Sequence, residues 1–421
     1  MNDIVYWIWL SLCCTPDTST FPKLLERFSG AKEIYEASDK EISSCLGHNS
    51  SDRSALLKRD LERAHSIYSF CEKRGVGLLS YASEKYPASL RNIKTPPVLL
   101  YYRGKLPDFD KLFLVSVVGT RSLSDYGRRY AFKISYDLAS SGATVVSGMA
   151  MGIDGVALAG AISAGGTTVA VLGSGIDVCY PEGHLTLARE IVKCGCVMTE
   201  YAPGTSPGRY NFPKRNRIIS GLCAATLVIE GREKSGALIT ARCAKEQGRA
   251  VYAMPGNIGS PNSEVSNLLL KNGARLCTCA DDIVRDFESL YPGVLNPFNL
   301  SPNVKVDIMA ELSRLSVIAV CQSDDIFTPP RTRKKSAHIE PKPEAPNSTD
   351  TIDLPSNEPP ESFDPKALKI YKRIPVDGDC PIESLVDDEI SLREVMKLLL
   401  KLEMGNFISM LPGESVQRKA K

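Results

Sequence analysis

The most constraining feature of this sequence is an alternation of short, β-branched apolar runs with segments of helix length between Leu112 and Phe287. Runs of this kind, almost continuously apolar, are typical of strands in a parallel sheet that helices cover on both faces. Right-handed crossovers make such a sheet doubly wound, so we predict an extended Rossmann-like α/β domain with a mainly parallel sheet. The predicted strands are residues 114–118, 143–147, 167–172, 196–199, 225–229 and 250–253, and the clearest helices are residues 126–140 and 185–193.

The segments that flank this alternation have different patterns. Residues 1–85 are predicted to form a small helical domain, and residues 86–293 to form the α/β domain. Residues 294–365 are rich in Pro, Ser, Asn, Glu and Lys, which predicts a flexible linker. Residues 366–421 regain helical periodicity and then end in a strand and a tight turn, which predicts a winged-helix-like domain.

Composition narrows the class of protein. The chain carries 51 Lys and Arg against 49 Asp and Glu, so a surface for nucleic acid must come from local clustering of charge. Its 13 cysteines form no C-x-x-C pair and only four histidines accompany them, which favours free thiols over a zinc site or a disulfide framework. The apolar N-terminus lacks the pattern of a signal peptide, and no run approaches the ~20 apolar residues of a membrane span. We predict a cytoplasmic protein without a metal or cofactor.

Loops containing glycine follow several predicted strands, at the edge where ligands bind in open α/β sheets. The first strand leads into Gly119-Thr120-Arg121, and the helix that follows offers free N–H groups and a positive dipole end to a phosphate. Taken alone, this segment also fits a plain strand-to-helix turn. Similar junctions contain Ser147, Gly148 and Gly152 after the second strand, and Lys234, Ser235 and Gly236 after the fifth. Together, these loops predict a polyanion site.

Two details of these loops limit the chemistry. The glycine spacing is not that of a dinucleotide-binding G-x-G-x-x-G, and neither a Walker phosphate loop nor a G-x-S-x-G elbow is present. Asp154 fits either the N-cap of the next helix or a polar contact to a ligand, and Ser235 fits an N-cap that also touches phosphate.

The most informative segment begins at Arg209. Residues 209–217 contain four positive charges, two aromatic rings and no acid. Single-stranded nucleic acid is held by cations on its phosphates and by aromatic rings under its bases, at ~1–3 kcal/mol for each stacked base. Basic residues at a helix start oppose the helix dipole, so an anionic ligand would account for them. The alternative is an ordinary solvated helix N-terminus.

These segments, in this order, resemble the DprA family of DNA-processing proteins. The resemblance runs from Val118 to Ala274 and is strongest in residues 147–154, Tyr180-Pro181, residues 212–222 and residues 235–241. It implies an extended Rossmann domain that binds single-stranded DNA, dimerises and helps to load a RecA-type recombinase. It also implies a SAM-like fold for the N-terminal helices and a winged-helix-like C-terminal domain.

The resemblance also implies roles for individual residues. The family's DNA pocket uses an arginine, a basic residue and a phenylalanine whose counterparts are Arg121, Arg209 and Phe212. We predict a protein that binds single-stranded DNA without catalysis, protects incoming DNA and helps recombinase loading in DNA uptake and recombination. The predicted DNA contacts are Arg121, Ser147, Gly148, Gly152, Arg209, Phe212, Lys214, Arg215, Asn216, Arg217, Lys234, Ser235 and Gly236.

Two alternatives remain open from the sequence. One is an enzyme that cleaves nucleoside monophosphates at the glycosidic bond, with Glu230 or Glu200 as the catalytic carboxylate. The other is an interaction module that works through the winged-helix-like domain.

Overall fold

The computed structural model divides into two compact units, residues Met1–Lys334 and Lys335–Lys421. It describes residues 3–46, 51–233, 235–297, 306–316, 364–375, 380–386, 392–404, 407–411 and 415–418. The proline-rich stretch after residue 316 lies outside these ranges until Asp364. The division of the chain into four segments therefore stays a prediction.

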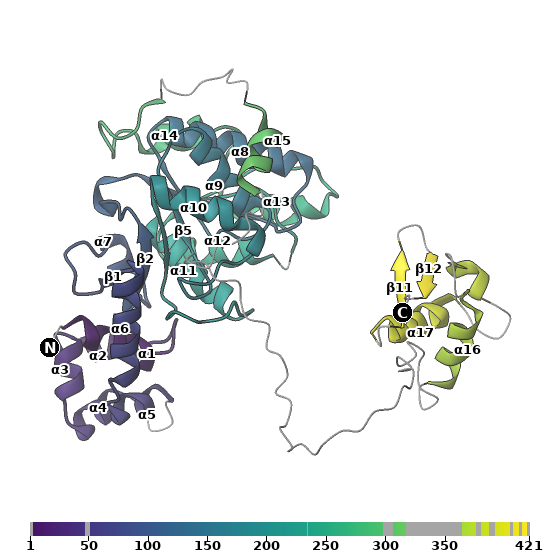
Figure 1. Ribbon diagram of the computed structural model, residues 1–421. Helices are drawn as coiled ribbons and strands as arrows, with labels where there is room; N and C mark the ends of the chain where they lie inside the picture. The colour runs from purple at the N-terminus through teal and green to yellow at the C-terminus, as the bar shows by residue number, and fades with distance from the viewer. Residues whose placement is uncertain are drawn as a thin grey trace, which may run out of the picture. The chain divides into compact units, whose positions relative to one another are not determined.

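The first unit contains an extended α/β sheet with the predicted Rossmann-like, doubly wound architecture (Figure 1). Its strands follow the order β1-β2-β6-β5-β4-β3-β7-β8-β9. The pairs β1–β2 and β2–β6 are antiparallel, and all pairs from β6 to β9 in this order are parallel. All six predicted strands are present. The strands are β1 (Gly77–Ser80), β2 (Leu99–Gly104), β3 (Leu114–Val118), β4 (Thr144–Ser147), β5 (Thr168–Val171), β6 (Cys196–Thr199), β7 (Ala225–Val228), β8 (Ala250–Ala253) and β9 (Arg275–Leu276).

Helices cover both faces of this sheet and bury two apolar cores. One face packs against α8 (Asp125–Ser140), α9 (Ile153–Ser163), α10 (Leu185–Cys194) and α14 (Asp281–Phe287). The other face packs against α7 (Ala88–Arg91), α11 (Asn211–Leu222), α12 (Gly236–Glu246) and α13 (Glu264–Lys271). Burial on both faces explains why most residues of strands β3 to β7 are apolar, with small buried hydroxyl side chains such as Ser116 and Thr226 as the exceptions. A further helix, α15 (Ile308–Ser316), lies against α9 and α10 within the predicted linker.

The N-terminal helices lie beside the β1–β2 end of the sheet (Figure 1). The first helix is apolar around its whole circumference because its neighbours enclose it, and both Trp7 and Trp9 are buried. The carboxylate of Asp52 ties the loop after this helix by accepting hydrogen bonds from the hydroxyls of Thr15 (2.5 Å) and Thr20 (2.6 Å). The helices are α1 (Ile4–Cys13), α2 (Thr20–Leu25), α3 (Ala31–Glu36), α4 (Asp39–Cys45), α5 (Ser51–Lys58) and α6 (Glu62–Arg74).

The second unit contains helices and a small antiparallel sheet, and its assignment as a winged-helix-like domain stays a prediction. It contains α16 (Pro365–Arg373), α17 (Leu392–Met404) and an antiparallel sheet of β10 (Cys380–Pro381), β12 (Ser415–Arg418) and β11 (Ile408–Leu411). Apolar side chains from both helices and the sheet form its own core. Across the described residues of both units, no helix is both long and apolar enough to cross a membrane.

Close contact between α8 and α9 depends on a glycine. A Cβ atom at Gly160 would come within 2.4 Å of the carbonyl oxygen of Phe132 on α8. We expect Gly160→Ala to lower the free energy of unfolding by about 1–3 kcal/mol, because the two helices must separate. That loss acts against the gain of up to ~1 kcal/mol in helix propensity.

Urea denaturation checks this expectation, with Gly183→Ala as the control because no atom lies within 4 Å of the added Cβ. A Gly160→Ala variant at least as stable as the parent protein would show that α8 and α9 are not held at this distance.

Candidate nucleic-acid interface

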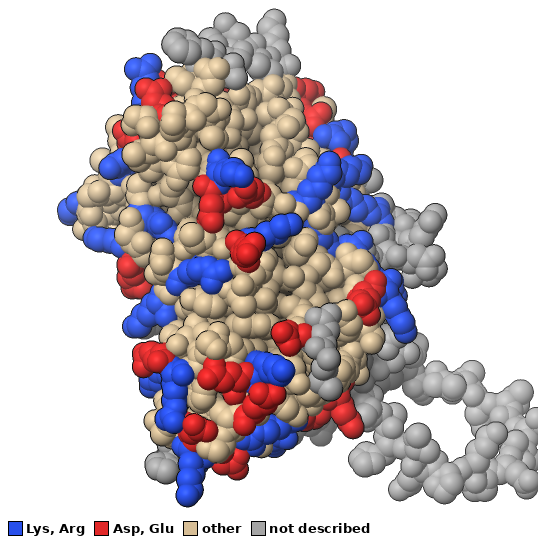
Figure 2. Space-filling view, turned by 90° about the vertical axis from the view of Figure 1, so that its left-hand side faces the viewer, with Lys and Arg blue, Asp and Glu red and all other residues tan. Residues whose placement is uncertain are grey.

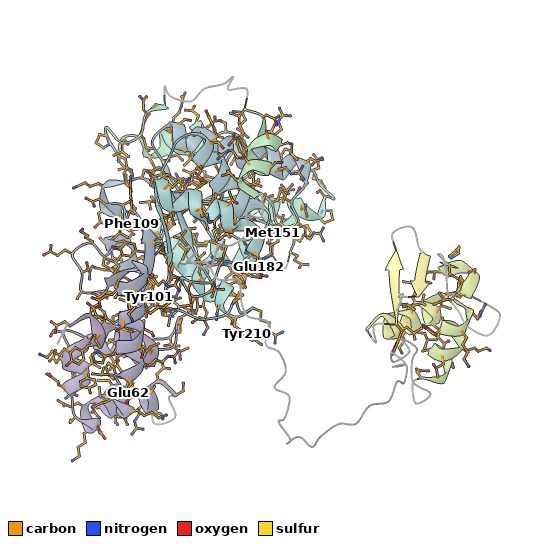
Figure 3. All side chains as sticks on the ribbon, in the orientation of Figure 1. Glu62, Tyr101, Phe109, Met151, Glu182 and Tyr210 are labelled. Carbon is orange, nitrogen blue, oxygen red and sulfur yellow. The ribbon has the colours of Figure 1, made fainter. Side chains whose placement is uncertain are left out.

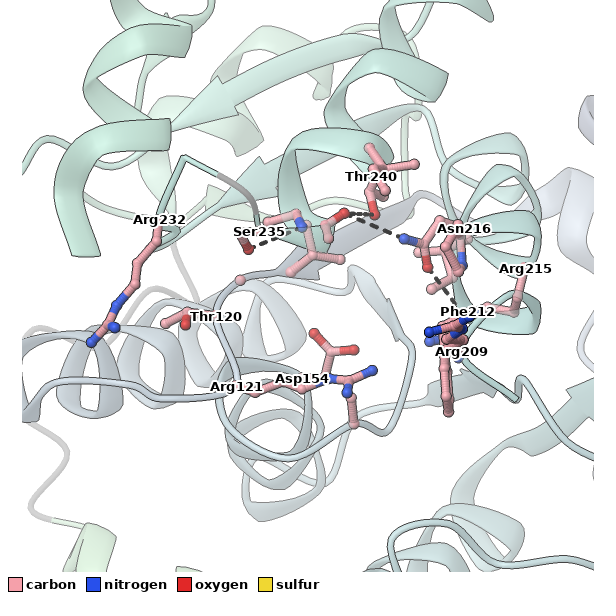
Figure 4. Close-up of a pocket in the computed structure, with 18 of the residues that line it drawn as sticks. Thr120, Arg121, Asp154, Arg209, Phe212, Arg215, Asn216, Arg232, Ser235 and Thr240 are labelled. Atoms are coloured by element: carbon pink, nitrogen blue, oxygen red, sulfur yellow. Dashed lines mark hydrogen bonds between the residues drawn. The ribbon is translucent and has the colours of Figure 1, made fainter. Parts of the chain in front are cut away.

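A cleft of about 690 Å³ opens at the carboxyl edge of the sheet (Figure 4). Strand β3 pairs with β4 on one side and with β7 on the other, so later strands are added to the sheet on both sides of β3. The cleft therefore lies where the strand order reverses, which is the usual ligand site of a doubly wound sheet. Loops that follow β3, β4, β5, β6 and β7 all contribute to its lining. This is the convergence of loops that the sequence predicted.

The cleft is cationic. Among the described residues that line it are four arginines, Arg121, Arg209, Arg215 and Arg232, against one acidic side chain, Asp154. By contrast, Lys, Arg, Asp and Glu are interspersed over the face of the molecule that Figure 2 shows. The positive charge that a polyanion needs is therefore concentrated locally in a chain whose net charge is only +2.

Arg121 and Phe212 meet in this cleft, although 91 residues separate them in sequence. The guanidinium carbon of Arg121 lies 4.9 Å from the centre of the Phe212 ring, within the range of a cation–π contact. Behind the ring, a Cβ atom at Gly173 would come within 2.8 Å of the ring, so this glycine makes room for it. Phe212 is the second residue of α11, and Arg121 is exposed in the loop after β3.

Arg209 and Tyr210 lie just before α11. The Arg209 guanidinium donates a hydrogen bond to the Tyr210 hydroxyl (2.7 Å) and lies 4.7 Å from the centre of its ring. Arg209 lines the cleft, whereas Tyr210 is 67% exposed and is not part of the lining. No side chain caps the start of α11, so its first N–H groups are left for solvent or a ligand.

Arg215 forms the floor of the cleft and is 3% exposed. Its guanidinium donates hydrogen bonds to the carbonyl oxygens of Gly148 (2.8 Å) and Val171, and to the side chain of Asn216 (3.2 Å). Burial lowers the pKa of Arg215 to about 10, which still leaves it charged at neutral pH. Three of its five donors are engaged within the protein, so Arg215 mainly ties α11 to the loop after β4 and to the end of β5.

Arg217 points away from the cleft. Its guanidinium forms a buried ion pair with Glu200 (2.5 Å), and its Nε atom lies 3.6 Å from the carboxylate of Asp17. Residues two positions apart on a helix face nearly opposite sides, which explains why Arg215 and Arg217 diverge. The predicted DNA contact of Arg217 is therefore not supported by its position. Lys214 is likewise outside the lining.

The glycine-containing loop after β4 is held by a hydrogen bond to a side chain of the following helix. The N–H of Gly148 donates to the Asp154 carboxylate (3.1 Å), so it is not free for a phosphate, contrary to the prediction. Ser147 is fully buried and donates to the Val117 carbonyl (2.7 Å). Gly152 adopts φ +86°, and a Cβ atom there would strike the carbonyl oxygen of Thr120. These three residues shape the loop and do not line the cleft.

Asp154 closes this loop from the first turn of α9, whose N-cap position belongs to Gly152. Burial raises the pKa of the Asp154 carboxyl, and the charge of Arg215 opposes that rise. On the other side of the loop, the buried His184 ring donates from Nδ1 to the carbonyl of Met149 (3.0 Å). Burial lowers the pKa of His184, so this contact is made by a neutral ring.

The junction after β7 lies at the cleft. Ser235 is the N-cap of α12 and accepts a hydrogen bond from the Ala237 N–H (3.2 Å). The carbonyl of Gly236 accepts hydrogen bonds from Asn216 (3.3 Å) and Thr240 (3.3 Å), as Figure 4 shows. Ser235, Gly236 and Asn216 all line the cleft, and Lys234 lies outside the described residues.

The sequence did not single out several lining residues, among them Thr120, Arg232 and Thr240. Arg232 faces the cleft from the side opposite Phe212 (Figure 4) and is held by its hydrogen bond to Asn262 (3.1 Å). Its position just after β7, at the same sheet edge, was the signal that could have identified it. Glu230, a candidate catalytic carboxylate in the sequence, accepts hydrogen bonds from the backbone and hydroxyl of Ser124.

A mainly parallel, doubly wound sheet with a cationic and aromatic cleft at its switch point defines a Rossmann-like protein suited to a polyanionic ligand. The chain belongs to the family described as DNA recombination-mediator protein A, whose sequence pattern matches residues 77–288.

Known proteins with similar sequences extend over most of the chain. Protein Smf of Synechocystis sp. is 30% identical over 406 residues, which are 94% of this chain and 95% of that protein. DNA processing protein DprA of Bacillus subtilis is 34% identical over 250 residues, or 58% of this chain and 84% of that protein. The crystal structure of DprA from Streptococcus pneumoniae superposes with a TM-score of 0.60 at 34% identity, covering 68% of this chain and 99% of that one.

The buried pair of Arg217 and Glu200 generates a prediction about stability. Burial raises the pKa of Glu200, and the charge of Arg217 opposes this. We expect Arg217→Met to cost about 3–5 kcal/mol of unfolding free energy at neutral pH, because it leaves an unpaired buried carboxylate. The variant's stability should fall as pH rises through the raised pKa of folded Glu200, since folding then favours the protonated acid.

Urea denaturation between pH 5 and pH 8 measures both effects. The exposed pair of Arg27 and Glu41 supplies the control, and Arg27→Met should cost no more than ~1 kcal/mol. Equal losses in the two variants, or a loss from Arg217→Met that does not grow with pH, would contradict this account of the pair.

Proposed function

We propose that this protein binds single-stranded DNA in the cleft between the loops after β3 and β7 and acts in DNA uptake and recombination. The observation that carries the proposal is the meeting of Arg121 with Phe212 at 4.9 Å, beside Arg209, in one cationic cleft. Cations for phosphates next to a ring for bases are the combination that unpaired nucleic acid requires. The names of the similar protein from Bacillus subtilis, DNA processing protein DprA, and of the family, DNA recombination-mediator protein A, support the same role.

Binding involves an exchange at Arg121. In the structure its guanidinium lies over the ring of Phe212, where a base would stack. An exposed cation–π contact contributes only ~0.5–1 kcal/mol, whereas a hydrogen bond to a charged group contributes ~1.5–3 kcal/mol. A phosphate that draws Arg121 away from the ring therefore gains more than the protein loses. The vacated ring face then takes the base.

The remaining lining residues complete the contacts. Arg209 and Arg232 stand on opposite sides of the cleft (Figure 4) and can each neutralise a phosphate. The start of α12 at Gly236 has open space around it, with no atom within 4 Å of where a Cβ would lie, so the sugar-phosphate backbone can approach closely. Affinity for single strands should then fall by about 0.7 log unit per phosphate contact for each tenfold rise in salt.

The proposed action is binding rather than catalysis. The two carboxylates that a glycosidase would need are engaged elsewhere, because Glu200 pairs with Arg217 and Glu230 accepts hydrogen bonds from Ser124. Neither of them lines the cleft. We further propose that the protein works in the cytoplasm as a homodimer and presents the bound strand to a RecA-type recombinase. The family's description as a recombination mediator supports that partner.

A double substitution tests the proposed site. We expect Arg209→Ala with Phe212→Ala to weaken binding of a labelled oligothymidylate at least tenfold, because it removes a phosphate contact and a stacking ring. Fluorescence anisotropy gives the affinity, and a duplex of the same length gives the preference for single strands.

The matched control is Arg129→Ala with Tyr126→Ala, an arginine and a tyrosine on the surface of α8 that do not line the cleft. The proposal fails if both double variants bind the oligonucleotide as tightly as the unchanged protein does.

A further inference from the structure

The loop after β5 places a second aromatic ring in the cleft. Tyr180 lines the cleft and is 37% exposed, while its neighbours Val178 and Cys179 are buried. Leaving a large ring partly in water sacrifices favourable burial of apolar surface. A tyrosine exposed inside a cationic cleft therefore points to a ligand that covers it.

This loop is held in place by its own hydrogen bonds. The Val178 N–H donates to the Gly175 carbonyl (3.0 Å), and the Ser174 hydroxyl donates to the Val178 carbonyl (3.0 Å). The Asp177 carboxylate accepts from the Gly204 N–H (2.8 Å) and so joins the loop to the segment after β6. Because the support is fixed before binding, a ligand that stacks on Tyr180 loses little affinity to ordering the loop.

Tyr180 and Phe212 stand next to each other but differ in how they are covered. Their ring centres are 5.5 Å apart and their planes are inclined by 39°. Arg121 lies over Phe212, whereas within the described part of the chain no arginine or lysine lies over the ring of Tyr180. A base can therefore stack on Tyr180 without first displacing an arginine from the ring.

The charges near Tyr180 show which part of a strand it can take. Glu182 is exposed two residues further on, and Figure 3 shows it with Met151 and Tyr210 on the side of the sheet away from Glu62 of the N-terminal helices. The phosphates belong beside the arginines that line the cleft, Arg121 and Arg209 among them, whereas an uncharged base can cover the ring of Tyr180.

We propose that Tyr180 is a second base-stacking residue, so that the cleft holds two unpaired bases, one on Phe212 and one on Tyr180. This inference rests on the proposed function. The 39° between the rings means that the two bases cannot lie parallel, so the strand bends between them. Paired bases in a duplex are stacked parallel and cannot follow, which adds to the preference for single strands.

The test compares Tyr180→Leu, Tyr180→Phe and the control Tyr126→Leu in the full chain. Tyr126 is 42% exposed, close to the exposure of Tyr180, but lies outside the cleft. We expect Tyr180→Leu to weaken binding of oligothymidylate by about 5- to 150-fold, the range for the loss of one stacked base. Tyr180→Phe should bind like the unchanged protein because it keeps the ring, and Tyr126→Leu should have no effect.

A second readout reports stacking directly. Oligothymidylates carrying one 2-aminopurine at successive positions should show two quenched positions in the complex, and Tyr180→Leu should restore the fluorescence of only one. Unchanged affinity of Tyr180→Leu, with single-strand binding by the parent protein intact, overturns this inference and leaves the proposed function standing. Equal weakening in Tyr180→Phe and Tyr180→Leu overturns it as well, because the hydroxyl would then be responsible. Absence of single-strand binding by the parent protein overturns both.

Discussion

The buried guanidinium of Arg215 joins three parts of the molecule at the carboxyl edge of the sheet. From α11 it donates to the carbonyl of Gly148 in the loop after β4 and to that of Val171 at the end of β5. Phe212 lies one helical turn earlier on the same helix, so this tie fixes where the ring stands relative to both loops. Arg121 reaches the same ring from the loop after β3.

Helix α11 divides its charges between the interior and the cleft. Arg215 and Arg217 are buried and hold the helix against the sheet and against Glu200, while Arg209, just before the helix, stays exposed. Buried arginines are costly unless paired, and these are engaged by carbonyl oxygens and a carboxylate. Residues 209–217 look uniformly basic in the sequence. In the structure, some of their cations hold the helix in place and others face the cleft.

The fold could be predicted because its signal is local. Strands β3 to β7 are buried on both faces, so their residues are mostly apolar and the pattern is visible in the sequence. The strands β1 and β9 were not predicted; they are the two edge strands of the sheet, and both residues of β9 are exposed. Arg121 was predicted because it follows a recognisable strand. Phe212 was predicted because it lies in a basic and aromatic segment that resembles the DprA family.

The directions in which side chains point could not be predicted from the sequence. Nothing in residues 209–217 shows that Arg217 turns inward to Glu200, because its partner lies 17 residues away in another loop. Gly148 was predicted to contact DNA, but its N–H donates to the Asp154 carboxylate. The sequence did not reveal this bond, because Asp154 also fitted the N-cap of the following helix. Arg232 was passed over although its position just after β7 places it at the same sheet edge as the other loops of the cleft.

The most direct measurement is a crystal structure of the protein with a short oligothymidylate. The account predicts a base on the ring of Phe212, with Arg121 moved from that ring to an adjacent phosphate. An oligonucleotide bound elsewhere, with Arg121 still over Phe212 and the cleft between the loops after β3 and β7 free of DNA, would contradict it.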